Sequence, residues 1–298
     1  MWGCSPRACR ATALEVSAAF VTRFAPSPTG LLHRGHAYSA LLAYAAAQAA
    51  GETFLLRIED IDATRARPEF EAAIFEDLAW LGITWREPVR RQSEHLDDYE
   101  AALARLAAEG LVYRCFRTRK EVAQAMASAP HGAMDTFRSA PLPAEEEAER
   151  LARGERFAWR LSLKAAQARL DGFEHLTFQE EGAGPNGETG LIQARPELGG
   201  DVVLARKDVG VAYHLAVVVD DALQGVTHVI RGCDLFEAAH VQRLLQALLG
   251  LPTPVYRHHR LLAGPDGKRY AKRDRAETLQ ALRAAGVTPE QLRQEMGL

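Results

Sequence analysis

Residues 23–36 of this chain read RFAPSPTGLLHRGH. An apolar run that predicts a short strand, Val21 to Ala25, overlaps its start, and an Ala- and Leu-rich run that predicts a helix, Ala37 to Ala50, follows it. The prolines and glycine between them are typical of a loop. Such a loop binds nucleotide phosphates in open α/β sheets, because the helix N-terminus offers unpaired N–H groups and a positive dipole end.

Two histidines in this stretch would add hydrogen-bond donors for a triphosphate. His33 and His36 flank Arg34 and Gly35, and the glycine would let the backbone or an adenine ring approach closely. The alternative is that both histidines only cap the helix or lie on the surface. The preceding P-S-P-T-G favours the nucleotide site over this alternative.

The chain continues as alternating strands and helices. Thr53 to Ile58 is typical of a buried strand, Pro68 to Leu81 of an amphipathic helix, and Gly51 stands where the helix before them should end. Further predicted elements are strands at Val211 to Val219 and Val226 to Ile230, and a helix at Ala238 to Leu249. The alternation favours an α/β fold with a parallel sheet.

Composition sets limits on the class of protein. A chain of 298 residues that is 47% hydrophobic can bury a sizeable core, and its net charge of −3 gives no overall sign of nucleic-acid binding. Positive charge is local: between Arg257 and Arg275 seven Lys or Arg residues stand against two acids. A solvated basic loop is the alternative interpretation of that cluster.

Cysteines and hydropathy suggest a compartment. The four cysteines form no C-x-x-C pair, which argues against a disulfide framework. The first 20 residues lack an apolar core typical of a signal peptide, and no stretch is long enough to span a bilayer. We therefore expect a cytoplasmic protein without a membrane partner, and a monomer.

The stretch at 23–36 resembles the signature region of class I aminoacyl-tRNA synthetases, with His33-Arg34-Gly35-His36 in the place of their HIGH motif. Together with LLRIEDID at 55–62 it is similar to the glutamyl and glutaminyl branch. The resemblance implies a Rossmann-like parallel sheet, an inserted α+β subdomain and a short helical C-terminal extension. It also implies ATP and Mg²⁺ as cofactors and L-glutamate and a tRNA as substrates.

A second element of the family stands near the C-terminus. Arg269-Tyr270-Ala271-Lys272-Arg273 occupies the place of the KMSKS loop, with Arg269 for its first lysine and Ala271 for its serine. The resemblance implies that Lys272 offsets charge on the triphosphate as pyrophosphate leaves. A generic basic turn is the alternative interpretation.

Glutamate presents two carboxylates and one ammonium group. Arginine suits a carboxylate, and a carboxylate suits an ammonium. The resemblance implies an amino-acid pocket made of Arg23, Ser27, Glu59, Tyr213 and Arg231. Glu59 would bind the ammonium and the arginines the carboxylates, and the sequence leaves open which arginine binds the side-chain carboxylate. For each charged residue a structural ion pair is the alternative.

Members of the family often carry zinc in the insertion, bound by a C-x-C pair, a tyrosine and a further cysteine. Here Tyr113 and Cys115 remain, but Arg117 stands at the second cysteine and Phe137 where the last is expected. One cysteine does not hold zinc, so we expect no zinc and a small buried Cys115.

The chain ends 26 residues after Lys272, whereas a complete glutamyl-tRNA synthetase continues with a helical anticodon-binding region. In this it is similar to the glutamyl-queuosine tRNA(Asp) synthetases, which attach glutamate to the queuosine base. Queuosine-containing tRNA(Asp) is thus the implied acceptor. Alternatives are a truncated synthetase charging a tRNA 3′ end, a small-molecule ligase or nucleotidyltransferase, an inactive tRNA-binding paralogue, and a structural Rossmann module.

We predict five segments along the chain. They are a loose extension at 1–20, the first half of the catalytic domain at 21–110, an acceptor-binding-like insertion at 111–205, the second half at 206–250, and the KMSKS-like loop with C-terminal helices at 251–298.

Overall fold

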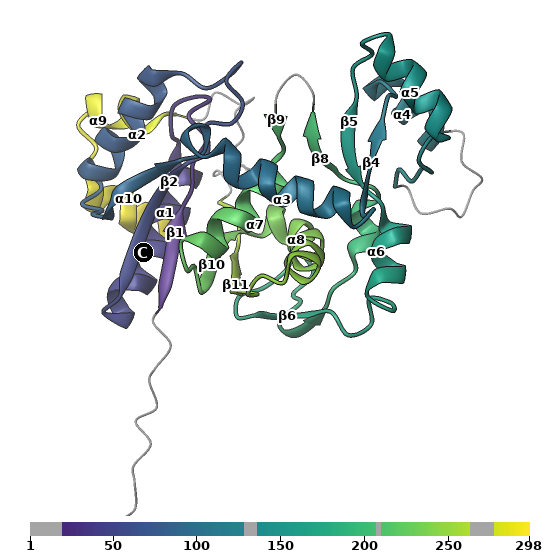
Figure 1. The fold of residues 1–298 in the computed structure, drawn as a ribbon. Coiled ribbons are helices and arrows are strands. Elements are labelled where there is room, and N and C mark those ends of the chain that lie inside the picture. Colours follow the sequence, from purple (N-terminus) through teal and green to yellow (C-terminus); the bar gives the residue numbers. More distant parts are fainter. Residues whose placement is uncertain (1–19, 128–135, 207–209, 263–276) are drawn as a thin grey trace, which may run out of the picture.

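A computed structural model of the protein describes residues 20–127, 136–206, 210–262 and 277–298 (Figure 1). Its main element is a seven-stranded sheet with the order β3-β2-β1-β10-β11-β6-β7. Every neighbouring pair is parallel except β6 and β7. The strands are β1 (Val21–Phe24), β2 (Thr53–Ile58), β3 (Arg86–Arg91), β6 (Thr177–Glu180), β7 (Gly190–Gln193), β10 (His228–Gly232) and β11 (Val255–His259). The predicted α/β fold with a mostly parallel sheet is confirmed.

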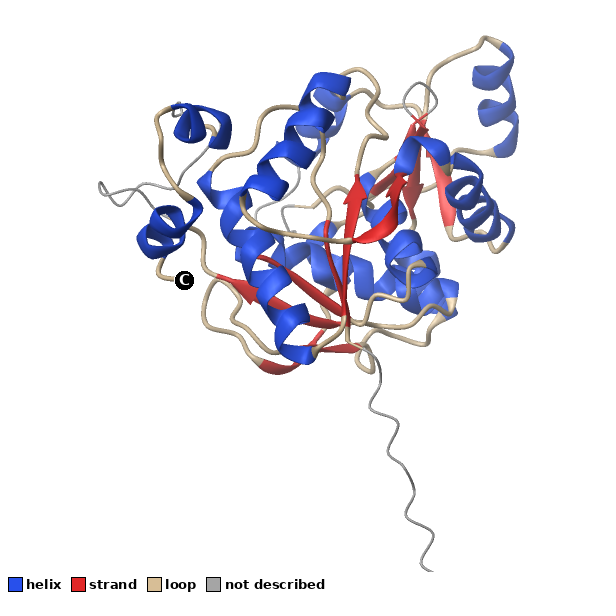
Figure 2. Ribbon diagram, turned by 90° about the vertical axis from the view of Figure 1, so that its left-hand side faces the viewer, coloured by secondary structure: helices blue, strands red, loops and turns tan. Residues whose placement is uncertain are grey.

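Helices cover both faces of this sheet (Figure 2). The helices in the described part of the chain are α1 (Arg34–Ala50), α2 (Pro68–Trp80), α3 (Leu96–Ala108), α4 (Arg119–Ala127), α5 (Ala144–Ala152), α6 (Leu163–Arg169), α7 (Tyr213–Leu223), α8 (Phe236–Leu249), α9 (Leu279–Ala284) and α10 (Pro289–Met296), with short 3₁₀ turns at Gln92–Glu94, Pro196–Gly199 and Cys233–Leu235. Of these, α4 and α5 lie away from this sheet (Figure 1). No helix in the described part of the chain is long and apolar enough to cross a membrane.

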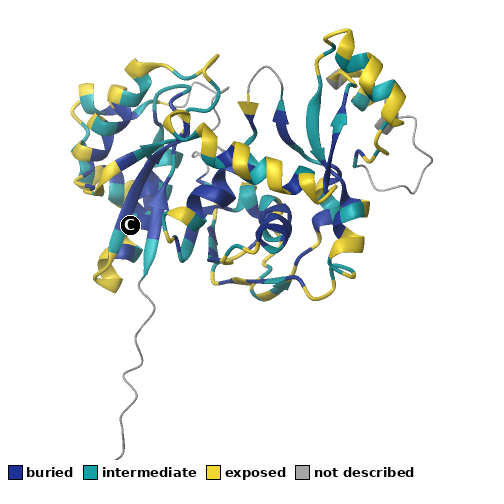
Figure 3. Ribbon diagram, viewed as in Figure 1, coloured by how far each residue is buried: buried dark blue, intermediate teal, exposed yellow. Residues whose placement is uncertain are grey.

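Successive side chains of the buried strands enter two separate cores, because a strand alternates its side chains between the faces of a sheet. On β2, Leu55 packs with residues of α3, α7 and α8, whereas Phe54 and Leu56 pack with residues of α1, α2, α9 and α10. On β10, Val229 and Ile230 divide in the same way. Figure 3 shows both cores as buried segments along the sheet. The two cores hold the carboxyl ends of β1, β2 and β10 in fixed positions.

A second, four-stranded antiparallel sheet stands beside the first (Figure 1). It has the order β4-β5-β8-β9, with β4 at Val112–Cys115, β5 at Ala158–Leu161, β8 at Val203–Arg206 and β9 at Gly210–Val211. Strands β6 and β7 fall within the range 111–205 that was expected as an insertion, but they pair with the main sheet. The segment boundaries proposed from the sequence stay a prediction.

The prediction of a strand at Val211 to Val219 is wrong. Only Val211 belongs to a strand, and the chain then forms helix α7. Its residues from Leu215 to Val219 are all buried and apolar, so this run lacks the polar positions that mark an amphipathic helix. The predicted strand at 53–58 and the helix end at Gly51, which has φ 67°, are confirmed.

Candidate active site

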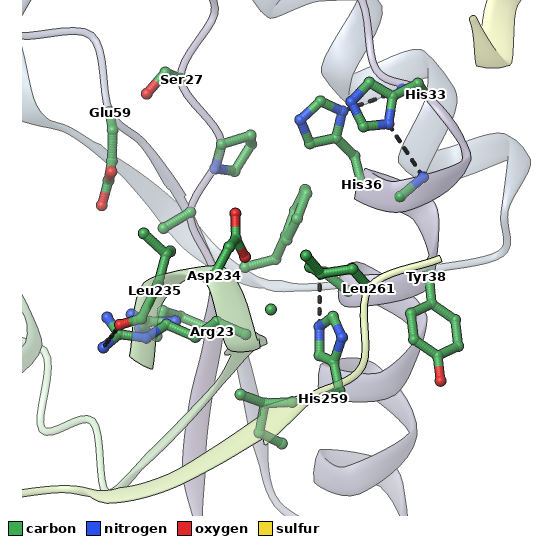
Figure 4. A pocket seen from close by; sticks show the side chains of 18 of the residues that line it. Arg23, Ser27, His33, His36, Tyr38, Glu59, Asp234, Leu235, His259 and Leu261 are labelled. Atoms are coloured by element: carbon green, nitrogen blue, oxygen red, sulfur yellow. Dashed lines mark hydrogen bonds between the residues drawn. The ribbon is translucent and has the colours of Figure 1, made fainter. Parts of the chain in front are cut away.

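A cavity of about 690 Å³ opens at the carboxyl ends of β1, β2 and β10 (Figure 4). The loop after β1 and the first turn of α1 form one wall, and the start of α7 and the segment after β10 form others. The predicted site residues that line it are Arg23, Ser27, His33, Gly35, His36, Glu59, Tyr213 and Arg231. Arg269, Tyr270, Ala271, Lys272 and Arg273 lie outside the described residues.

His33 and His36 cap the first turn of α1 and lie one on the other, with 3.8 Å between ring centroids. Nδ1 of His33 accepts a hydrogen bond from the backbone N–H of Gly35, and Nδ1 of His36 accepts one from the backbone N–H of His33, each at 3.1 Å. Both Nδ1 atoms are therefore acceptors, and each neutral ring carries its proton on Nε2. The histidines thus cap the helix and also line the pocket.

Gly35 allows this arrangement. A Cβ atom at this position would lie 3.0 Å from Cε1 of the His33 ring, which is closer than an ordinary contact. The glycine therefore lets the imidazole fold back over the first turn of the helix. The close approach expected from the sequence is made here by the His33 side chain.

Glu59 lies on the opposite side of the pocket from the two histidines (Figure 4). It follows β2 directly, is 8% exposed, and its Oε1 accepts a hydrogen bond from Nη2 of Arg57 at 3.1 Å. Burial raises the pKa of Glu59, and the positive charges of Arg57 and Arg23 offset only part of that effect. Its ionised form would gain from a cation in the pocket.

Arg23 forms a buried ion pair with Asp221 of α7. Nε of Arg23 lies 3.1 Å from Oδ1 of Asp221, and Nη2 lies 3.4 Å from Oδ2. Asp221 also accepts a 2.7 Å hydrogen bond from Nη1 of Arg57. Arg23 thus lines the pocket as one half of an ion pair, so the structural interpretation of this arginine also holds.

Arg231 differs from Arg23 in its partners, although both are 5% exposed. Its guanidinium donates to Nε2 of His258 at 3.0 Å, to Oε1 of Gln242 at 2.9 Å and to the carbonyl of Leu235 at 3.0 Å. Within the described residues no carboxylate forms an ion pair with it. Since burying a charge without a counter-ion is costly, Arg231 is suited to receive an anion.

Sequence reasoning missed several residues around the pocket. Arg57 and Asp221 connect the predicted site residues but do not line the cavity. The signals for them in the sequence were an arginine inside the predicted strand at 53–58 and two adjacent acids, at 220 and 221, after an apolar run. Ser39 and His259 line the pocket and are joined by a 2.8 Å hydrogen bond between Oγ and Nε2, which ties α1 to β11.

The expected zinc ligands lie beside a cavity of about 310 Å³, which is lined by Tyr113, Cys115 and Arg117 among others. Cys115 is 6% exposed and lies in a small apolar cluster with Tyr113 and Phe137, which confirms that it is buried. The guanidinium of Arg160 lies 4.4 Å from the ring centroid of Phe137. In the described part of the chain no three His, Cys, Asp or Glu side chains are grouped to hold a metal ion. That this protein binds no zinc stays a prediction.

Comparisons with known proteins agree with this geometry. The family model of the catalytic domain of class I tRNA synthetases (E and Q) matches residues 19–298. A glutamyl-Q tRNA(Asp) synthetase of Rhodobacter capsulatus is 48% identical over 296 residues, which cover 93% of this chain and 100% of that relative. One of Symbiobacterium thermophilum is 44% identical, over 90% of this chain and 82% of the relative.

Glutamate–tRNA ligases are also similar. Glutamate–tRNA ligase 2 of Dinoroseobacter shibae is 39% identical over 90% of this chain and 58% of its own length. The crystal structure of a glutamate tRNA ligase from Elizabethkingia meningosepticum in complex with its amino acid superposes with a TM-score of 0.71 at 30% identity, over 86% of this chain and 52% of that one. This chain therefore belongs to the class I tRNA synthetases of the E and Q type and, within them, to the glutamyl-Q tRNA(Asp) synthetases.

Proposed function

We propose that this protein activates L-glutamate with ATP as glutamyl adenylate and transfers the glutamyl group to the queuosine base of tRNA(Asp). The observation that carries the proposal is the distribution of charge in the pocket. A buried carboxylate, Glu59, and a buried arginine without a carboxylate partner among the described residues, Arg231, line the same cavity as the stacked histidines at the start of α1. This set suits an acidic amino acid beside a nucleotide.

On the amino-acid side, Glu59 would bind the ammonium group and Arg231 a carboxylate of glutamate. Arg23 is neutralised by Asp221 and would contribute hydrogen bonds more than net charge. Ser27 and Tyr213 line the pocket with hydroxyl groups that could complete the contacts of the substrate. If Arg231 binds the side-chain carboxylate, free glutamine would leave its charge unpaired and be rejected.

On the nucleotide side, the first turn of α1 would bind the phosphates. The Nε2–H groups of His33 and His36 and the positive end of the helix dipole are suited to a triphosphate. Lys272 would add a further positive charge. The pocket holds two carboxylates, Glu59 and Asp234, and no dedicated metal cage is formed by the described residues. Mg²⁺ would enter bound to the ATP phosphates and offset their charge.

The reaction would proceed in two steps. An oxygen of the glutamate α-carboxylate attacks the α-phosphorus of ATP, and the bond from that phosphorus to the bridging oxygen of pyrophosphate breaks. A hydroxyl of the queuosine cyclopentenediol then attacks the activated carbonyl carbon, loses its proton and displaces AMP. Neither step uses a protein nucleophile. The residues of the pocket act by positioning the reactants and stabilising charge.

Two observations support the identity of the acceptor and the cellular compartment. Two relatives that are named glutamyl-Q tRNA(Asp) synthetases are 48% and 44% identical to the chain, and a glutamate–tRNA ligase is 39% identical, which supports queuosine as the acceptor. Cys115 and Cys233 are free, which fits a reducing compartment. We expect a monomer in the cytoplasm.

The test is an aminoacylation assay with ATP, Mg²⁺ and labelled glutamate. Three acceptors are compared: tRNA(Asp) with queuosine, tRNA(Asp) without it, and tRNA(Glu). Label retained only on the queuosine-containing tRNA is expected. Label on tRNA(Glu) would show a synthetase that charges the 3′ end. Absence of glutamate-dependent pyrophosphate exchange would refute the catalytic proposal.

A further inference from the structure

Three buried side chains from three adjacent strands form a chain of hydrogen bonds that ends at the pocket. Glu180 on β6, His258 on β11 and Arg231 on β10 are 1%, 2% and 5% exposed. Oε2 of Glu180 lies 2.6 Å from Nδ1 of His258, and Nε2 of His258 lies 3.0 Å from Nε of Arg231. Of the three, only Arg231 lines the cavity.

The direction of these hydrogen bonds is fixed by chemistry. The Nε–H group of Arg231 can only donate, so Nε2 of His258 must carry a lone pair. The proton of the neutral imidazole is then on Nδ1, where it is donated to Glu180. A carboxylate on one ring nitrogen selects the tautomer and orientation of the ring and strengthens the other nitrogen as an acceptor.

Glu180 itself is held in place by the backbone. Its Oε1 accepts hydrogen bonds from the backbone N–H groups of Gly182 and His258, both at 2.8 Å. A Cβ atom at Gly182 would lie only 2.0 Å from the carbonyl oxygen of His258, so the segment after β6 approaches β11 closely only because this residue is a glycine. The carboxylate has little freedom to leave the ring.

We propose that Glu180 and His258 are positioning residues that orient the guanidinium of Arg231 for a substrate carboxylate and leave its charge available. The proposal rests on the proposed function, in which Arg231 binds glutamate. A carboxylate in direct contact would neutralise the arginine, as Asp221 neutralises Arg23. The imidazole of His258 lies between the negative charge of Glu180 and the guanidinium of Arg231. The other hydrogen-bond partners of Arg231, Gln242 and the carbonyl of Leu235, are uncharged.

Two substitutions at one position separate this role from simple packing. In His258→Gln the longer amide can offer an oxygen close to the place of Nε2, and so an acceptor for Arg231. In His258→Asn the shorter amide reaches only the place of Nδ1. This variant keeps a hydrogen-bond donor for Glu180 but has no acceptor for Arg231. His240→Asn is the matched control, because His240 is also 2% exposed but has no hydrogen bond to Arg231.

The measurement is glutamate-dependent pyrophosphate exchange with the full chain, with KM determined separately for glutamate and for ATP. Loss of a hydrogen bond to a charged group is expected to raise the KM for glutamate in His258→Asn by about tenfold to a hundredfold. The KM for ATP should stay unchanged. His258→Gln should recover most of the loss, and His240→Asn should change thermal stability but neither KM.

Several results would overturn the inference. One is an unchanged KM for glutamate in His258→Asn, and another is an equal change in the KM for ATP. Equal losses in His258→Asn and His258→Gln would also exclude the acceptor role of Nε2. If His258→Asn does not fold, Glu180→Gln, which keeps the size of the side chain, should raise the KM for glutamate alone, and no change would refute the relay. Failure of the wild-type protein to exchange pyrophosphate would instead refute the proposed function.

Discussion

Asp221 on α7 binds Arg57 on β2 through a 2.7 Å hydrogen bond between Oδ1 and Nη1. Arg57 is fully buried and donates on its other side to Glu59, so the helix fixes a pocket carboxylate through one intervening residue. The neighbouring Asp220 accepts hydrogen bonds from Arg90 at 2.7 Å and from Tyr99 at 2.8 Å. Two consecutive acids of one helix thus connect β2, β3 and α3 beneath the site.

Substitution of Asp221 should therefore destabilise the fold strongly. Asp221→Asn removes the negative charge that Arg23 and Arg57 share, and breaking a buried pair from one side typically costs about 3–5 kcal/mol of unfolding free energy. Denaturant titration measures the loss. The control is Glu76→Gln. Glu76 is 63% exposed and forms an ion pair with Arg283, so its loss should lower the free energy of unfolding by less than about 1 kcal/mol. Equal losses in both variants would contradict the expectation.

The ion pairs of Asp221 with Arg23 and Arg57 also predict that the stability of the fold depends on pH. Burial alone would raise the pKa of Asp221, but the charges of Arg23 and Arg57 outweigh it and hold the pKa below its ordinary value. A carboxyl with a lowered pKa stabilises the fold above the pKa it has in the unfolded chain, and this stabilisation is lost as pH falls through the folded value. Thermal midpoints measured between neutral and acid pH should fall less in Asp221→Asn than in the wild type.

His33 offers a way to separate capping from catalysis. Asparagine is a good helix N-cap, so His33→Asn should keep the stability of α1 while it removes the Nε2 donor. We expect unchanged thermal unfolding and a fall of about tenfold or more in kcat for adenylate formation, because donors aimed at developing charge act mainly in the transition state. His33→Ala should lose stability as well. Normal activity in His33→Asn would mean that the imidazole serves only as a cap.

Local patterns made part of this structure predictable from the sequence. The loop at 23–36 and the strand that ends before Glu59 follow from turn chemistry and apolar runs over fewer than 15 residues. The partners of the site residues do not follow from such local patterns. Asp221 is 198 positions from Arg23, and Glu180 is 78 positions from His258. Such contacts depend on strand order, which no local pattern encodes.

Helix α7 shows why an element type was also missed. Its run of valines has strand propensity, yet it is buried between α3 and α8 and the helix is selected by tertiary packing. The two acids that follow the valines would be costly in the interior without partners, and in the structure both are paired with arginines. Acids inside an apolar run are thus a sign of buried partners that lie far away in the sequence.

Glu59 should lower stability and support binding at the same time. Burial raises its pKa, so its contribution to stability is present below its unfolded pKa and is lost as pH rises through the folded value. At neutral pH the neutral variant Glu59→Gln should therefore unfold at an equal or higher temperature. Its KM for glutamate should rise by about a hundredfold, because the ammonium loses its charged partner. A lower thermal midpoint or an unchanged KM would contradict this.

The wild-type enzyme should show the matching pH profile. A protonated Glu59 cannot offer a negative charge to the ammonium group, so kcat/KM for glutamate should fall on the acid side with a midpoint above the ordinary pKa of a glutamic acid. At saturating ATP and low glutamate, kcat/KM for glutamate reports the ionisable groups of the ATP-bound enzyme that receives glutamate, so these are the required conditions. A profile without this acid limb would argue that another residue binds the ammonium.

The small sheet should not depend on zinc. Cys115 is buried beside Phe137, and the guanidinium of Arg160 lies 4.4 Å from the centroid of the Phe137 ring, so the side chain at the place of the last expected ligand is a phenylalanine held by a cation–π contact. Incubation with a zinc chelator should leave the thermal midpoint unchanged. Phe137→Ala should lower the free energy of unfolding by about 3–5 kcal/mol, since a buried ring is removed. A midpoint that falls with chelator and recovers with added zinc would show that this region binds the metal after all.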